Sequence, residues 1–103
     1  EEIIVPKRSK KTDHVFHQYT IKIDNKVRKS LVNFLNSKDI PSMIYYPVPL
    51  YKQEAFSKYV CEDFTIPNIE KLCDSVLSFP IHSEFENSNQ DIIISSVRSF
   101  FKK

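Results

Sequence analysis

Alternating hydrophobic and polar positions begin the chain and predict its first two strands. Residues 3–5 (IIV) form a β-branched run that is stopped by Pro6, which is typical of a short strand. Residues 14–23 (HVFHQYTIKI) alternate, so that odd-numbered side chains share one face and even-numbered side chains share the other. We therefore expect a longer second strand over residues 14–23.

Three later segments carry hydrophobic residues at helical spacing. The first follows Asp24, whose carboxylate can accept the free N–H groups of a helix start. The second begins between Thr65 and Asn68, and the third begins near Asn87, with Gln90 in a capping-box position. The apolar stripes of the three helices are Val27, Leu31, Phe34 and Leu35; Ile69, Leu72, Cys73 and Val76; and Ile93, Val97, Phe100 and Phe101.

Two further short strands complete the pattern. Residues 43–51 (MIYYPVPLY) carry no charge and begin like a strand, but Pro47 and Pro49 cannot donate ladder hydrogen bonds. Residues 77–81 (LSFPI) predict another strand, broken by Pro80. The whole pattern indicates an α+β fold with a small, mostly antiparallel sheet and helices packed on one face. The other face would meet solvent or a partner, and the uncharged segment favours a partner.

Composition narrows the function classes. The 103 residues suit one domain, and 41% of them are hydrophobic, which is typical of an ordered chain. The chain has no glycine, which excludes a phosphate-binding P-loop, a dinucleotide-binding fingerprint and a nucleophile elbow. The first residue is Glu1 and the single methionine is Met43, so we expect residues 1–103 to be a processed or excised piece of a longer protein.

Charge and cysteine content indicate an ordinary intracellular setting. The net charge of +2 is too small to imply nucleic-acid binding, and the basic run 7–11 (KRSKK) is typical of a solvated loop. Cys61 and Cys73 form neither a disulfide framework nor a metal pair, which fits a reducing, cytoplasmic location. No apolar run approaches the roughly 20 residues that span a bilayer, so we expect no membrane partner.

Histidines and tyrosines are the candidate site residues. His14 and His17 have a metal-ligand spacing, but residues three apart on a strand face opposite sides, so we expect no metal site. Tyr45 and Tyr46 should leave their strand on opposite faces, with the following prolines fixing where one phenol lies. From the residues alone, a proline-rich edge loop with buried aromatic rings explains the same pattern.

Three blocks of the sequence resemble one protein family. HVFHQYTIKI (14–23), IPSMIYYPVPLYKQEAF (40–56) and VLSFPIHSEF (76–85) are similar, in this order, to motifs in the C-terminal domain of the DegT/DnrJ/StrS sugar-nucleotide aminotransferases. The family's pattern after the adjacent tyrosines is proline-x-proline-leucine. Family members often carry histidine where Tyr51 stands here.

The resemblance implies a pyridoxal phosphate (PLP) enzyme, usually a homodimer, that moves an amino group from glutamate to a keto-sugar nucleotide. It places the catalytic lysine and the cofactor site in a large N-terminal domain. We therefore expect no catalytic or cofactor-binding residue in residues 1–103, and no activity of this part alone. By motif match, Tyr45 and Tyr46 are expected to bind substrate, with His17 and Tyr51 as further candidates.

Two other hypotheses remain open at this stage. The chain could be a stand-alone α+β binding or regulatory module that docks a protein or small ligand on residues 43–51. It could also bind nucleic acid through residues 7–11, in which case affinity would fall steeply with added salt.

Overall fold

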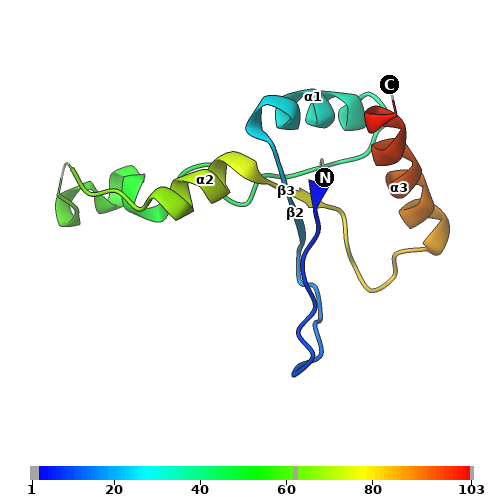
Figure 1. The fold of residues 1–103 in the computed structure, drawn as a ribbon, viewed down its shortest axis with the longest axis horizontal. Helices are drawn as coiled ribbons and strands as arrows, with labels where there is room; N and C mark the ends of the chain where they lie inside the picture. Colours follow the sequence, from blue (N-terminus) through cyan, green and yellow to red (C-terminus); the bar gives the residue numbers. More distant parts are fainter. Residues whose placement is uncertain (1–2, 62, 103) are drawn as a thin grey trace.

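The chain folds as a three-stranded antiparallel sheet with three α-helices over the described residues, 3–61 and 63–102, of a computed structural model (Figure 1). The strands lie in the order β1-β2-β3, so that β2 is central. The predicted fold class is confirmed. In chain order the elements are β1 (Ile3–Ile4), β2 (Tyr19–Ile23), α1 (Asn25–Asn36), the 3₁₀ helices η1 (Leu50–Lys52) and η2 (Glu54–Tyr59), α2 (Pro67–Ser75), β3 (Val76–Phe79) and α3 (Asn87–Phe101).

The core lies between one face of the sheet and two helices. Ile21 of β2 pairs with Leu77 of β3, and both side chains are fully buried. The predicted stripe of α1 supplies Leu31 and Leu35, each with no exposed surface. The predicted stripe of α3 packs against this cluster through Ile93, Val97, Phe100 and Phe101. Burial of these apolar surfaces is the main force that holds the helices to the sheet.

Helix α1 is fixed at its start and at its middle. The Asp24 carboxylate accepts the N–H of Lys26 at 2.8 Å, so the predicted N-cap is confirmed. Arg28 donates from Nη1 to the carbonyl oxygens of Cys73 (2.6 Å) and Val76 (3.3 Å). These carbonyls lie where α2 ends, and a cation there satisfies the helix's free carbonyl groups. Arg28 thus joins α1 to the junction of α2 and β3.

The second strand is shorter than the alternating pattern predicts. Pairing begins at Tyr19, and residues 14–18 lie outside the sheet. The reason is local, because Phe16 has a positive φ of 45° and its N–H donates to Nδ1 of His14 at 2.9 Å. The His14 ring also stacks on Phe16, with centroids 4.0 Å apart. Side-chain alternation therefore holds in residues 19–23 but not before them.

The strand predicted from Met43 is also wrong. Met43 makes a single isolated bridge to Ser78, through backbone hydrogen bonds of 3.0 and 2.7 Å. Prolines on both sides, Pro41 and Pro47, leave no room for a longer ladder. The strand predicted over residues 77–81 is observed as β3, which begins one residue earlier and ends at Phe79.

Helices α2 and α3 begin where the sequence predicts, but the burial of α2 and the cap of α3 differ from the prediction. Helix α2 begins at Pro67, yet Ile69 and Leu72 of its stripe remain 38% and 42% exposed. The cause is position, because α2 lies beside the sheet rather than over the core (Figure 1). Helix α3 begins at Asn87, but the predicted capping box is wrong: Glu86 is the N-cap residue, with no side-chain cap bond.

Two parts of the chain extend away from the core. Residues 49–61 and 63–75, here called the arm, contain η1, η2 and α2 and project to the side opposite α3 (Figure 1). The connection between β1 and β2 projects in another direction, away from α1. Among the described residues, no helix has the length and apolar character needed to cross a membrane.

Candidate functional site

His17 and Tyr45 come together at one cavity of about 360 Å³. His17 belongs to the segment that leads into β2, and Tyr45 follows the Met43 bridge. Together with the end of β3, these two segments form the cavity walls. The complete lining is His17, Gln18, Pro41, Ser42, Met43, Tyr45, Ser78, Phe79, Pro80 and Ile81.

Hydrogen bonds at Ser78 fix these walls. Its backbone exchanges two hydrogen bonds with Met43, and its buried hydroxyl lies 2.8 Å from Oγ1 of Thr20 on β2. The segment carrying Tyr45 is thereby tied to β3, and β3 to β2. Because the sheet is rigid relative to loops, it holds His17 and Tyr45 on the same cavity.

The polar groups of this cavity are mostly uncharged. Tyr45 contributes a hydroxyl group, Gln18 an amide and His17 an imidazole, whereas the Ser42 hydroxyl is buried away from the cavity surface. Oγ of Ser42 is buried, and it has no hydrogen-bond partner within the described part of the chain. Sequence reasoning missed Gln18 and Ser42, because neither belongs to a motif with a recognisable spacing. Hydroxyl, amide and aromatic groups of this kind suit a neutral polar ligand such as a sugar ring.

Tyr46 lies at a different hollow. Its ring is 67% exposed and borders a hollow of about 440 Å³ lined by Tyr46, Pro47, Val48, Lys52, Gln53 and Glu54. The prediction that the two tyrosines leave a strand on opposite faces is wrong, because they do not follow a strand. No strand forms here, the peptide bond between them is cis, and their ring centroids lie 5.8 Å apart, edge to face.

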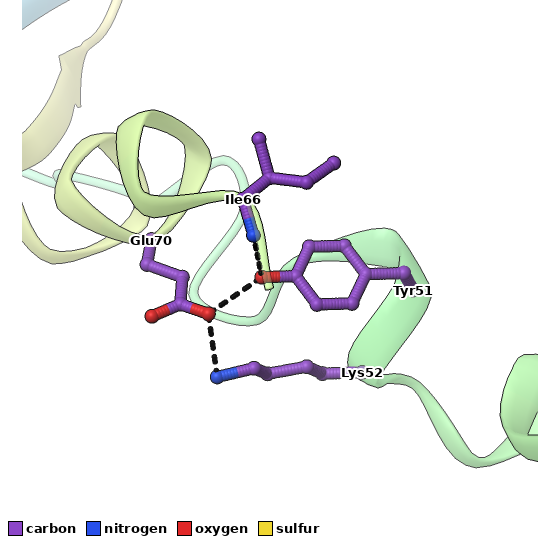
Figure 2. A network of polar contacts seen from close by, with 4 residues as sticks. All are labelled: Tyr51, Lys52, Ile66 and Glu70. Carbon is purple, nitrogen blue, oxygen red and sulfur yellow. Dashed lines mark hydrogen bonds and ion pairs between the residues drawn. The ribbon is translucent and has the colours of Figure 1, made fainter. Parts of the chain in front are cut away.

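Tyr51 lies at neither of these two hollows. Its hydroxyl donates to Oε1 of Glu70 at 2.6 Å and accepts the backbone N–H of Ile66 at 3.0 Å (Figure 2). Lys52 completes the group with an ion pair to the same Glu70 oxygen at 2.8 Å (Figure 2). We call these four residues the Glu70 network. Sequence reasoning missed Lys52 and Glu70, since the contact depends on how η1 meets α2.

The Glu70 network changes the proton affinity of three side chains. Partial burial, and next the hydrogen bond to Glu70, raise the pKa of Tyr51. The hydrogen bonds from Lys52 and then Tyr51 lower the pKa of Glu70. The hydrogen bond to Glu70 raises the pKa of Lys52. At neutral pH the network therefore contains a neutral tyrosine, a carboxylate and an ammonium group.

The residues at the His17–Tyr45 cavity do not fit a complete PLP site. A Schiff base needs a lysine, and the cofactor's phosphate and ring nitrogen need groups of opposite charge. The lining of this cavity in the described residues contains no lysine, arginine, aspartate or glutamate. The described residues also contain no cluster of three or more His, Cys, Asp or Glu side chains able to hold a metal ion.

A family comparison identifies the chain. The model of the DegT/DnrJ/EryC1/StrS aminotransferase family matches residues 1–98. The chain belongs to this family. The resemblance seen in the three sequence blocks is thereby confirmed, and the stretch they occupy falls within the matched residues.

Curated relatives of this aminotransferase family match most of the chain. A pleiotropic regulatory protein of Geobacillus stearothermophilus is 32% identical over 97% of the chain and 26% of its own length. A UDP-2-acetamido-2-deoxy-3-oxo-D-glucuronate aminotransferase of Pseudomonas aeruginosa is 31% identical over 81% of the chain and 22% of its own length. The chain thus spans about a quarter of the length of these relatives.

Solved structures of the DegT/DnrJ/EryC1/StrS family share the fold. An aminotransferase of this family from Brucella abortus superposes with a TM-score of 0.86 at 33% identity, covering 99% of the chain and 27% of that protein. DesV of S. venezuelae, solved with a ketimine intermediate, superposes with a TM-score of 0.89 at 26% identity, covering 100% of the chain and 27% of that protein.

Proposed function

We propose that residues 1–103 are the small C-terminal domain of a PLP-dependent sugar-nucleotide aminotransferase. The family match over residues 1–98 carries this proposal. Relatives named as aminotransferases of UDP-linked and dTDP-linked sugars support the substrate class. The glutamate donor, the homodimer and a cytoplasmic location come from the family resemblance.

The domain's own role would be to form part of the wall of the substrate cleft. Tyr45 and His17 share a cavity whose groups suit hydroxyl-rich ligands, so they would bind the sugar. Tyr46 would contact a part of the ligand that extends from this cavity to the hollow at Tyr46, since the two tyrosine rings lie edge to face with centroids 5.8 Å apart. Tyr51 would support these tyrosines from a distance rather than contact substrate, because its hydroxyl is already bonded to Glu70 and Ile66.

The cofactor would be held outside residues 1–103. A structural neighbour, the Bacillus subtilis protein NtdA, was solved with bound pyridoxamine phosphate, which supports PLP chemistry in the longer protein. The cavity described above offers no lysine for a Schiff base, so no step of transamination is derived from it. The large N-terminal domain is the proposed partner that supplies the catalytic lysine.

The test is an amino-transfer assay on the full-length protein. Purified protein with PLP is incubated with glutamate and a panel of UDP- and dTDP-linked keto-sugars, and both 2-oxoglutarate and amino sugar are measured. We expect both products in equal amounts with at least one substrate. Residues 1–103 alone should give neither product nor PLP absorbance. Absence of amino transfer with every keto-sugar would contradict the proposal.

A regulatory role is the second candidate. It is favoured by one relative, the pleiotropic regulatory protein of Geobacillus stearothermophilus. The surface would be residues 43–51, where Met43, Tyr46 and Val48 are exposed. The same assay separates the candidates, because a regulator without enzymatic activity produces no 2-oxoglutarate.

A further inference from the structure

The Glu70 network joins two parts of the arm that are separate in sequence. Three polar contacts converge on two oxygen atoms, Oη of Tyr51 and Oε1 of Glu70 (Figure 2). Tyr51 comes from η1, which directly follows residues 43–49, here called the tyrosine segment, and Glu70 comes from the first turn of α2. The contact therefore holds the end of the tyrosine segment against a helix.

Tyr51 also contacts the start of α2. The N-cap residue of this helix is Ile66, whose side chain cannot accept a hydrogen bond. The Tyr51 hydroxyl accepts the N–H of Ile66 itself, which is a different group from the N–H groups that an N-cap side chain binds. The Tyr51 ring packs edge to face on Phe64 with centroids 5.2 Å apart. Ring packing and hydroxyl bonding together leave the Tyr51 side chain one well-defined position.

Lys52 connects the Glu70 network with the hollow beside Tyr46. The same lysine that pairs with Glu70 also lines that hollow together with Tyr46, Pro47 and Val48. Pro47 and Pro49 have fixed φ angles, which limits the conformational freedom of the backbone between Tyr46 and Tyr51. A displacement of Tyr51 would therefore move the wall of the Tyr46 hollow.

We propose that Tyr51, through Glu70 and Lys52, is a positioning residue that sets the place of the Tyr45–Tyr46 pair. Its hydroxyl contacts α2 rather than ligand, and the prolines transmit its position to the tyrosines. The identity of the ligand rests on the proposed function, a sugar nucleotide. The positioning itself rests only on the contacts described above.

The first experiment measures amide hydrogen exchange in the full-length protein. Tyr51→Phe removes the hydroxyl and keeps the ring on Phe64. We expect at least about threefold to tenfold faster exchange at Ile66 and in residues 43–53. The variant loses two hydrogen bonds, one of them to the Glu70 carboxylate, and a single neutral hydrogen bond already contributes about this factor to local opening. The matched control is Tyr59→Phe on the same arm, whose ring is 84% exposed. The amide hydrogens of the Tyr59→Phe variant should exchange at the same rates as those of the wild type.

The second experiment measures steady-state kinetics of the same variants. Tyr51→Phe should raise KM for the keto-sugar nucleotide about threefold to tenfold with kcat unchanged, because a displaced binding wall weakens ground and transition states alike. Lys52→Met should give a rise in the same direction. Tyr59→Phe should leave both parameters unchanged. A uniform loss of folded protein would instead lower the apparent kcat and leave KM unchanged.

Two results overturn the positioning role. One is faster exchange at Ile66 with unchanged exchange in residues 43–53, which would make Tyr51 a local contact of α2 alone. The other is unchanged KM in an active enzyme. A wild-type protein with no transaminase activity would contradict the proposed function, while exchange in residues 43–53 would still decide the positioning role.

Discussion

His17 and Tyr45 line the same cavity although they belong to segments far apart in the sequence. The pairing of Met43 with Ser78 brings the second segment to β3, and β3 in turn pairs with β2 next to His17. Neither residue is held in place by its own element. Their proximity depends on strand pairing, and it is the reason that this cavity is the proposed sugar-binding part of the chain.

Removing the Tyr45 hydroxyl should weaken substrate binding. Under the proposed function, Tyr45→Phe in the full-length protein is expected to raise KM for the keto-sugar nucleotide about threefold to tenfold, because one neutral hydrogen bond is lost. His17→Ala should act in the same direction. Steady-state kinetics measure both effects, with Tyr59→Phe as the matched tyrosine control. An unchanged KM in both site variants would remove this cavity from the substrate site.

The hydroxyl pair of Thr20 and Ser78 should show energetic coupling. Thr20→Val or Ser78→Ala alone leaves the partner hydroxyl without its 2.8 Å contact, at a cost of about 1 kcal/mol each. The double variant should be less destabilised than the sum of the two single variants, since no unpaired hydroxyl remains. Urea unfolding of the four proteins measures the coupling. Strictly additive effects would show that the hydroxyls do not interact.

The cap of α1 should contribute measurable stability. Asp24→Ala removes the acceptor for the Lys26 N–H and is expected to lower the free energy of unfolding by about 1 kcal/mol. Asp24→Asn should retain most of this stability, because an amide oxygen also caps helices. Asp13→Ala, in the exposed connection before β2, is the control. Equal unfolding midpoints for both alanine variants would contradict the cap.

Truncating a core side chain should lower the free energy of unfolding more than truncating an exposed side chain. Leu31→Ala or Leu35→Ala removes a fully buried side chain between α1 and the sheet, so we expect a loss of about 2–5 kcal/mol. Ile94→Ala on α3, where the side chain is 40% exposed, should cost much less. Chemical denaturation provides the comparison. A similar loss at Ile94 would place the core elsewhere.

The Glu70 network should weaken in acid. The folded-state pKa of Glu70 lies below its ordinary value of 4.5, so its stabilising contribution is complete above that value. The contribution is lost as pH falls through the lower folded-state pKa. Amide exchange at Ile66, corrected for intrinsic rates, should therefore accelerate below about pH 4.5. Glu70→Gln should remove this pH dependence, and a dependence that persists in that variant would have another origin.

Local patterns were sufficient to predict the three α-helices, although they predicted neither of the 3₁₀ helices η1 and η2. Asp24 as a cap and the stripe from Val27 to Leu35 predict α1 correctly, because helix contacts join residues close in sequence. Strand ends were predicted less well. The alternation in residues 14–18 is real, yet the turn at Phe16 and His14 competes with the sheet for the same backbone groups. Such competition is invisible in a hydrophobic pattern.

The sequence by itself determined the family, the fold class, the three helices and the importance of the tyrosine-proline segment. Only the tertiary structure decided that His17 shares a cavity with Tyr45, that Tyr46 faces a separate hollow, and that Tyr51 bonds to Glu70. The physical reason is the separation along the sequence of the residues that interact. Periodicity and capping act between neighbours along the chain, whereas these contacts depend on how β3, η1 and α2 meet in space.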